Sequence, residues 1–422
     1  MQKKINADLL IDNATQVITC VPASNDALGK IDNAAVAIAG DRIVAVGPRN
    51  TIKSKVDLST TDVVDASGKI VAPGFVDCHT HLVFGQSRVR EYALKMTHSV
   101  ADIEASGLQT GIPASIQMTR AATEADLFSS AMDRLNRMLQ YGTTTVESKS
   151  GYGISWPAER KMLRVNQRLE QAQPIEVIST FLGAHDFPPE IDREDHDQRA
   201  AYIRKLTGEM IPRVAEENLA VFCDIYCDVG YYTAQESETV LRCGMQHGLA
   251  PRIHTDAYEN IGGSSLAANL PAVSADHLNY CTQEEMHAMA KAGVVGVVLP
   301  ALDFAVAHPD PFAARPMIEA GMTLALGTNL NPGNWTESMQ LVMQLACRNH
   351  GMSPEEAMLA ATTGAARALQ REQQIGCLAP GFQADVQLWD LPSFEDVIYR
   401  IGNNATCLVI KNGKIVMRGK AA

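Results

Sequence analysis

The pattern of hydrophobic and polar positions divides the chain into three stretches. Near both ends, β-branched and polar residues alternate between Gly, Asp and Asn turns, as in AAVAIAGDRIVAVG and TCLVIKNGKIVMRG. Such segments predict short strands joined by turns. We expect the two ends to pair into one small β-sandwich made from residues 1–73 and 371–422, with a separate unit at residues 74–370.

In the middle stretch, apolar strand-like runs alternate with helix-like segments. The helix-like segments carry apolar periodicity, as in ADLFSSAMDRLNRMLQ and PAERKMLRVNQRLEQ, and capping boxes open two more, at Thr282–Glu285 and Ser353–Glu356. The runs with the character of buried strands are GFVDCHTH, TTTVESKSG, EVISTFLGAHD, LAVFCDIYC, APRIHTD, AVSADHL, GVVGVVLP and TLALGTNLNP. Eight β–α units predict an α/β fold, a (β/α)8 barrel of the TIM type.

Polar side chains gather where these predicted strands end. Catalytic groups of such barrels lie at the carboxyl ends of the strands, so this placement predicts one shared site. The ends carry His79 and His81, Lys149 and Tyr152, His185, Cys227, His254 and Asp256, His277, and Asn329 and Asn331.

The His79-Thr80-His81 motif is the most informative of these. In a strand, residues i and i+2 point to the same face, so both imidazoles would enter the barrel together. Two neutral imidazoles suit a divalent cation such as Zn²⁺ or Fe²⁺. His254 is the expected third ligand. We interpret His185 as a ligand or a substrate donor, and His277 as a proton-transfer group.

A hydrolytic barrel usually adds a carboxylate at the last strand, where it binds metal and takes a proton from water. This chain has Asn329 there, and an amide is a poor metal ligand and not a base. Asp256 is the nearest alternative carboxylate, although we expect it to point away from the metal. Arg88, at the expected barrel mouth, suits a carboxylate clamp, whereas Arg90 is expected to be solvated.

The amino-acid composition limits the kinds of binding partner that we expect for this protein. A net charge of −12 argues against a broad surface for nucleic acid or anionic membrane, but leaves room for a small anionic substrate. We find neither a signal peptide nor an apolar run of about 18 residues. The nine scattered Cys, Cys223 and Cys227 included, are not a disulfide framework. We therefore expect a cytoplasmic protein, and the sequence leaves its oligomeric state open, a homodimer included.

Several segments together resemble a known family. HTHLVFGQSR, ESKSGYG, FLGAHDFPPE, FCDIYC, SADHL, VVLPALDF and TNLNPG, in this order, are similar to the imidazolonepropionases of the amidohydrolase superfamily. The similarity runs from about residue 5 to the end of the chain. It implies hydrolysis of 4-imidazolone-5-propanoate to N-formimidoyl-L-glutamate in histidine degradation, with one divalent metal ion, Zn or Fe.

The family pattern also implies residue roles. His277 and His185 are the candidate catalytic residues, and His277 would stand beside the attacking water. Metal binding falls to His79, His81, His254 and the position of Asn329. Substrate contacts fall to Arg88, which would hold the propanoate, and to Tyr152, His185, Asn331, Gly333 and Asn334.

Two positions depart from that pattern. The family usually has Asp at the position of Asn329, and Glu or Gln at the position of Ala257. The departures leave alternatives open: a divergent amidohydrolase acting on another ring, by opening a hydantoin-like lactam or by ring deamination, or a weakened or non-catalytic homologue.

Overall fold

A computed structural model describes residues 5–419, and an eight-stranded parallel sheet forms its middle part. The strands are hydrogen-bonded to one another in sequence order, from β6 to β13. Each of the eight predicted strands is present, which confirms the barrel fold. Their bounds are β6 (Phe75–Asp77), β7 (Thr143–Lys149), β8 (Glu176–Ala184), β9 (Phe222–Cys227), β10 (Ala250–Thr255), β11 (Ser274–His277), β12 (Val295–Val298) and β13 (Leu324–Leu326).

Beyond the ends of β6 and β13, hydrogen bonds join the first and last βα units. The backbone N–H of Asn329 donates to the carbonyl of His79 at 3.0 Å, and that of His81 donates to Leu330 at 2.9 Å. The two imidazoles therefore follow β6 in irregular chain, which corrects the expectation that they lie within a strand. Contacts with the last unit, rather than strand alternation, fix their direction.

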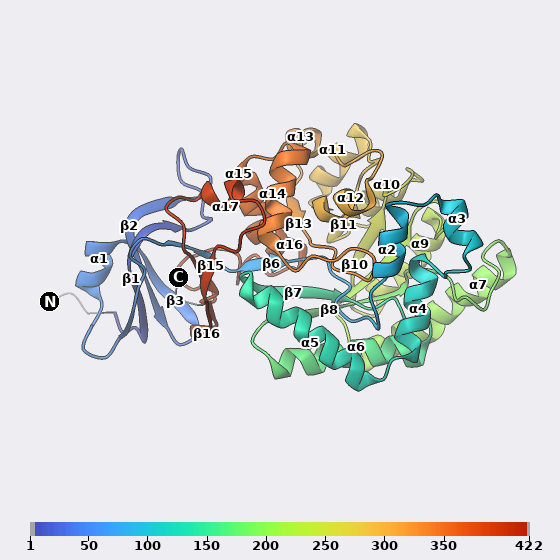
Figure 1. The fold of residues 1–422 in the computed structure, drawn as a ribbon, viewed down its shortest axis with the longest axis horizontal. Coiled ribbons are helices and arrows are strands. Elements are labelled where there is room, and N and C mark those ends of the chain that lie inside the picture. The colour runs from blue at the N-terminus through green and yellow to red at the C-terminus, as the bar shows by residue number, and fades with distance from the viewer. Residues whose placement is uncertain (1–4, 420–422) are drawn as a thin grey trace.

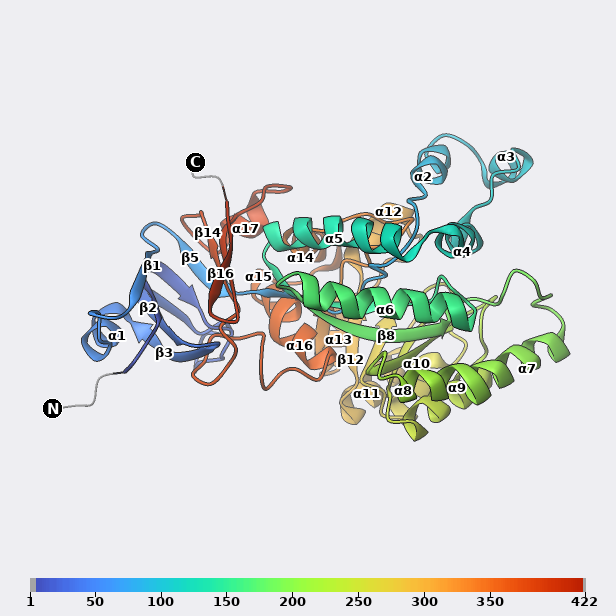
Figure 2. The same cartoon turned by 90° about the horizontal axis from the view of Figure 1, so that it is seen from below.

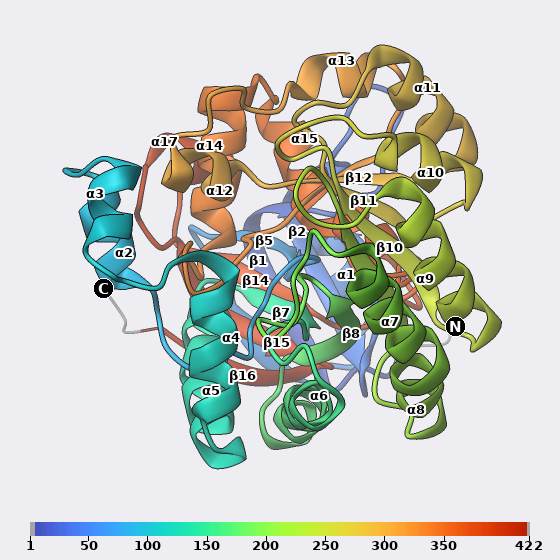
Figure 3. The ribbon, with the colours of Figure 1, turned by 90° about the vertical axis from the view of Figure 1, so that its right-hand side faces the viewer.

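Helices surround the barrel, as the view along it shows (Figure 3). In α5 (Glu124–Gln140) the apolar side chains at helical spacing, such as Leu127, Leu135 and Met138, are buried. This helix lies beside α6 (Trp156–Ala172) (Figure 2). The two predicted capping boxes are present.

The helices that follow barrel strands begin with α2 (Val89–Lys95), α3 (Val100–Ala105), α4 (Gly111–Ala121), α5 (Glu124–Gln140), α6 (Trp156–Ala172), α7 (His196–Lys205), α8 (Ile211–Glu216) and α9 (Ala234–Gln246). They continue with α10 (Gly263–Asn269), α11 (Gln283–Ala292), α12 (Pro300–Val306), α13 (Ala314–Glu319), α14 (Met339–His350), α15 (Pro354–Leu359) and α16 (Ala365–Ala368). The π-helical turns η1 (Leu206–Met210) and η2 (Ala360–Gly364) interrupt the series, and α17 (Asp396–Tyr399) follows later.

The two chain ends form a second sheet beside the barrel (Figure 1). Its order is β16-β15-β14-β5-β1-β2-β3, with β4 also paired to β1, so that β5 from the first stretch pairs with β14 from the last, as predicted. Buried side chains of these strands, including Ile11, Val36 and Val386, form a hydrophobic core of their own. The strands are β1 (Leu9–Ile18), β2 (Lys30–Ala39), β3 (Arg42–Pro48), β4 (Asp62–Asp65), β5 (Ile70–Pro73), β14 (Val386–Trp389), β15 (Thr406–Lys411) and β16 (Lys414–Arg418).

A short helix and two buried thiols complete the description of the fold. The short helix α1 (Arg49–Lys55) was not among the predicted elements of the first stretch. Of the predicted end units, residues 1–4 and 420–422 lie outside the described residues. Among residues 5–419, no helix combines the length and apolar character needed to cross a bilayer. Cys223 and Cys227 are buried free thiols in β9, which is one of the predicted strands.

Candidate metal centre

Three imidazoles meet at the carboxyl end of the barrel. The ring centroids of His79 and His254 lie 4.7 Å apart, and that of His81 lies 5.6 and 5.7 Å from them. One nitrogen from each ring lies within 4.8 Å of the others. His79 Nε2, His254 Nε2 and His81 Nδ1 are buried without a hydrogen-bond partner. Unpartnered buried nitrogens are costly, and a shared cation would satisfy all three rings.

The electrostatics keep two of these rings in the ligand form. Burial, followed by the positive charge of Lys149, holds the pKa of His79 well below its usual value. Burial, followed by the neighbouring His185, does the same to the pKa of His81. Neutral imidazole is the form that binds a metal ion, so these residues fit a divalent cation.

A layer of buried charged residues lies among the strands next to these rings. Lys149 Nζ lies 2.9 Å from Glu147 and from Asp224, and 3.5 Å from Asp276. Arg252 Nη2 lies 3.2 Å from Asp276. Lys149 was predicted as a strand-end residue, but its four charged neighbours were not predicted. The signal was present, because Glu-x-Lys, Asp-x-Tyr and Arg-x-His pairs at i and i+2 interrupt apolar strands.

The charges in this layer stabilise one another. Burial opposes ionisation of Asp276, but Arg252 and Lys149 hold its pKa well below the usual range. Burial likewise opposes ionisation of Asp224, and His254 together with Lys149 lowers its pKa. Both carboxyl groups are therefore hydrogen-bond acceptors.

A cavity of about 690 Å³ opens above the imidazoles. Most of the predicted site residues line it, and His79 lies buried beside it. The predicted residues that line the cavity are His81, Arg88, Tyr152, His185, His254, His277, Asn329, Asn331 and Gly333.

His185 and His277 flank the three imidazoles. The ring of His185 stacks on that of His81 at 4.7 Å, and the centroid of His277 lies 5.3 Å from that of His254. Burial, followed by His254, lowers the pKa of each to about 3, so both are neutral near pH 7. His277 follows Asp276 directly and has φ +86°. This left-handed backbone lets two adjacent residues both face the site.

Arg88 is held at the cavity wall by two partners. Its Nη1 donates to Ser115 Oγ at 3.0 Å, and its Nε lies 3.1 Å from Glu91 Oε2. A Cβ on Gly333 would lie 2.1 Å from Arg88 Nη2. Glycine at 333 therefore leaves the space that the guanidinium occupies. Arg90 is exposed, as expected.

The asparagines after β13 have different surroundings. Asn329 lines the cavity with φ +48°. Asn331 Nδ2 donates to the carbonyl of Asn329 at 2.9 Å and to its Oδ1 at 3.2 Å. Asn334 Nδ2 donates to the carbonyls of Thr328 and Asn329, each at 3.0 Å. Asn334 does not line the cavity, and its amide instead braces the turn that carries the other two.

Four further tyrosines line the cavity, and none of them was among the predicted site residues: Tyr92, Tyr226, Tyr231 and Tyr258. The rings of Tyr226 and Tyr231 are stacked at 4.1 Å, so this wall suits a flat ring. Asp256 points away from the imidazoles, as predicted, because Ser264 and Thr255 donate to its carboxylate. Cys227 does not line the cavity, so its place among the strand-end residues was uninformative.

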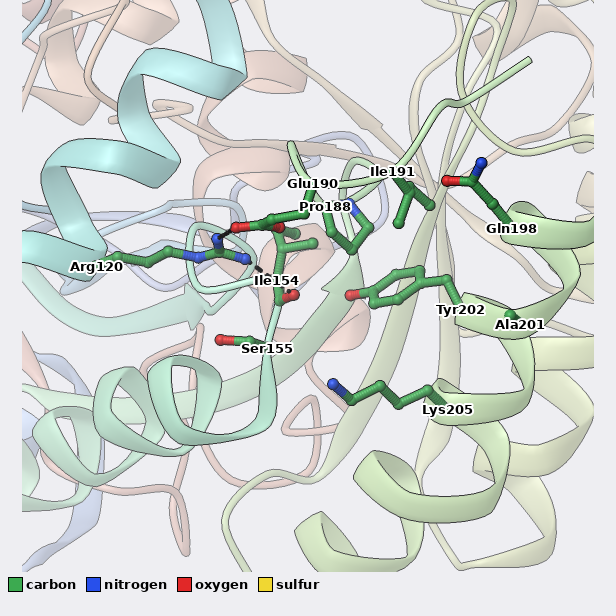
Figure 4. A pocket seen from close by; sticks show the side chains of 10 residues that line it. All are labelled: Arg120, Ile154, Ser155, Pro188, Glu190, Ile191, Gln198, Ala201, Tyr202 and Lys205. Atoms are coloured by element: carbon green, nitrogen blue, oxygen red, sulfur yellow. Dashed lines mark hydrogen bonds and ion pairs between the residues drawn. The ribbon is translucent and has the colours of Figure 1, made fainter. Parts of the chain in front are cut away.

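A second hollow, of about 590 Å³, lies elsewhere and is lined by Arg120, Glu190, Tyr202 and Lys205 among others (Figure 4). Arg120 binds Glu190 there and donates to the carbonyls of Gly153 and Ile154. None of the predicted site residues lines this hollow, so it is separate from the metal centre.

Comparisons with known proteins agree with this geometry. Models of the amidohydrolase family match residues 62–106 and 252–416. An imidazolonepropionase of Shouchella clausii is 40% identical over 97% of this chain and 93% of its own length. One of Geobacillus kaustophilus is 42% identical over 92% of this chain and 91% of its own length.

Solved structures support the fold. An adenosine deaminase of Xanthomonas campestris with bound zinc has a TM-score of 0.73 at 20% identity, covering 98% of this chain and 93% of that one. An atrazine chlorohydrolase of Arthrobacter aurescens complexed with zinc has a TM-score of 0.68 at 18% identity, covering 98% and 97%. On the identity to the curated relatives over nearly its whole length, the chain belongs to the imidazolonepropionases of the amidohydrolase family.

Proposed function

We propose that this chain hydrolyses 4-imidazolone-5-propanoate to N-formimidoyl-L-glutamate, with His79, His81 and His254 holding one divalent metal ion. The observation that carries the metal site is the convergence of three buried imidazoles whose free nitrogens have no other partner. The identity to curated imidazolonepropionases carries the substrate. The chain is thus a hydrolase that acts on the C–N bond of a cyclic amide, in histidine degradation.

Three nitrogen ligands suit Zn²⁺ or Fe²⁺, and we propose one of these two ions. When bound, such an ion supplies Lewis acidity and lowers the pKa of a water ligand, which is the chemistry that amide hydrolysis needs. Both of the structural neighbours described above contain zinc. We propose that Asn329, a neutral residue, occupies the fourth ligand position, called here the fourth corner of the metal centre.

The chain's own groups bind the substrate and move the protons. Arg88 clamps the propanoate carboxylate through its guanidinium. Tyr152 and His185 contact the ring from one side of the cavity. His277, neutral and beside His254, takes a proton from the attacking water and returns it to the ring nitrogen as the C–N bond breaks. The water oxygen ends in the new carboxyl group, which loses the second proton of the water to solvent and becomes a carboxylate.

Three of the predicted substrate contacts, Asn331, Gly333 and Asn334, follow the last barrel strand. Asn331 and Gly333 line the wall beside Arg88, and we propose that they contact the substrate. We propose that Asn334 acts through the turn that it braces. Residues 74–370 are proposed as the catalytic unit, and a homodimer stays a prediction that light scattering tests.

The decisive experiment follows the loss of imidazolone absorbance by the purified protein, with the bound metal quantified. We expect chelation and His81→Ala each to abolish turnover. His287→Ala, an exposed imidazole on α11, is the matched control and should retain it. Turnover unchanged by chelation and by His81→Ala would refute the metal site.

A substrate panel separates the remaining alternatives. Ala257 is buried, and its neighbours Asp228 and His308 bind only its backbone, so no polar side chain reaches the ring from this position. Hydantoin-like lactams and cyclic amidines should be poorer substrates than the imidazolone. Ammonia release from an amidine ring, with no imidazolone turnover, would favour a deaminase instead.

A further inference from the structure

Two buried carboxylates each hold one of the imidazoles assigned to the metal. Asp276 Oδ2 lies 2.6 Å from His79 Nδ1, and the Asp224 carboxylate lies 3.1 Å from His254 Nδ1. A carboxylate only accepts hydrogen bonds, so each Nδ1 carries the proton and each Nε2 keeps its lone pair. These two Nε2 atoms are among the nitrogens without a partner in the metal centre.

The two carboxylates are themselves tied together. Lys149 Nζ lies 2.9 Å from Asp224 Oδ2 and 3.5 Å from Asp276 Oδ2. Ser274 Oγ donates to Asp276 Oδ1 at 2.6 Å, and the backbone N–H of Ile225 donates to Asp224 Oδ1 at 2.8 Å. Both carboxylates therefore have little freedom to turn away from their imidazoles.

The same layer carries a formal negative charge. The carboxylates of Glu147, Asp224 and Asp276 face the two cations Lys149 and Arg252, and all five side chains are buried. One negative charge is left over, next to the metal centre. This matters because the residue at the fourth corner of that centre, Asn329, is neutral.

We propose that Asp224 and Asp276 are positioning residues of the metal centre. They lock His254 and His79 in the Nδ1–H tautomer, Lys149 couples them, and their layer supplies the negative charge that position 329 lacks. This rests on the proposed metal function. Partners of this kind typically contribute 10–100-fold to metal affinity.

The first test uses the wild-type protein without metal. Two-bond ¹⁵N–¹H correlation spectra of the histidine rings report the tautomer of each imidazole. We expect Nδ1–H tautomers at His79 and His254. Nε2–H tautomers at both would overturn the proposal, whether or not the protein binds metal or turns over. The tautomers can therefore refute the positioning proposal independently of the proposed function.

The second test measures Zn²⁺ affinity by chelator competition in folded variants. Asp276→Asn and Asp224→Asn should each lower it by about 10–100-fold. Asp256→Asn is the matched control, because this carboxylate is equally buried but bonded to Ser264 and Thr255. Affinity unchanged in both variants would overturn the proposal. If either variant does not fold, the wild-type spectra decide.

The double variant tests the coupling through Lys149. If the ammonium sets both carboxylates together, Asp224→Asn with Asp276→Asn should lower affinity by less than the product of the single losses. A loss equal to that product would show that Lys149 does not couple the two carboxylates.

Discussion

The backbone N–H of Asn329 donates to the carbonyl of His79 at 3.0 Å. This bond joins the backbone of Asn329 to that of His79, one of the three clustered imidazoles, across the junction of the first and last βα units. Asn329 also lines the cavity, and we propose its side chain for the fourth ligand position of the metal centre.

Replacing Asn329 with Asp should raise both Zn²⁺ affinity and turnover, the affinity by about tenfold or more, which is about 1.4 kcal/mol. A carboxylate binds the cation, whereas an amide does so poorly. Chelator competition and initial rates measure the two effects. Asn412→Asp, which has a similar φ of +50° in the β15–β16 turn, should change neither. No rise in either quantity would place residue 329 outside the metal centre.

Replacing Arg88 with Met should raise KM for the propanoate substrate by about 10–100-fold, with a smaller effect on kcat. A hydrogen bond to a charged group contributes about 1.5–3 kcal/mol, and Met keeps the apolar stem alone. Steady-state kinetics measure the split between KM and kcat. Arg90→Met is the exposed control. An equal loss on an imidazolone without the propanoate would contradict the clamp.

Replacing His277 with Asn should lower kcat by roughly 10²–10⁴-fold, the usual contribution of a general acid–base group, and leave KM nearly unchanged. Asn tolerates the left-handed backbone at this position, so the fold should hold. Zn²⁺ affinity retained within a few-fold serves as the control. Unchanged kcat would assign proton transfer to another group.

Stability of the metal-free protein should fall as the pH drops from 7 towards 3. In the unfolded chain His185 and His277 protonate near pH 6.5, but in the folded chain their pKa values are lowered to about 3. Between these values the unfolded state binds more protons, which costs up to about 1.4 kcal/mol per pH unit for each ring. Urea unfolding at pH 7, 6 and 5 measures the slope. A slope unaffected by His185→Asn with His277→Asn would contradict this origin.

Much of the site followed from local patterns. His79-x-His81 and His254 were predicted from residue type and from their places at strand ends, and Arg88 from its place at the expected barrel mouth. The cavity brings His81, His254 and Arg88 together. The polar pairs Glu147-x-Lys149 and Arg252-x-His254 carried a further signal, since polar residues at alternate positions of a buried strand share one face. Asp276 lacked a signal of its own, because it directly precedes His277 and only His277 was interpreted as a functional residue.

The sequence by itself determined the hydrophobic periodicity of the strands and helices, the pairing of the two chain ends, and the residue types available for chemistry. Hydrophobic periodicity is a local property, so it can be recognised without knowledge of the fold. Tertiary structure decided which residues face the metal centre. His277 enters it through a left-handed backbone, His79 through bonds to the last unit, and Asp224 and Asp276 through the closure of the barrel around Lys149. These contacts join residues far apart in the chain, and only packing of the complete barrel fixes them.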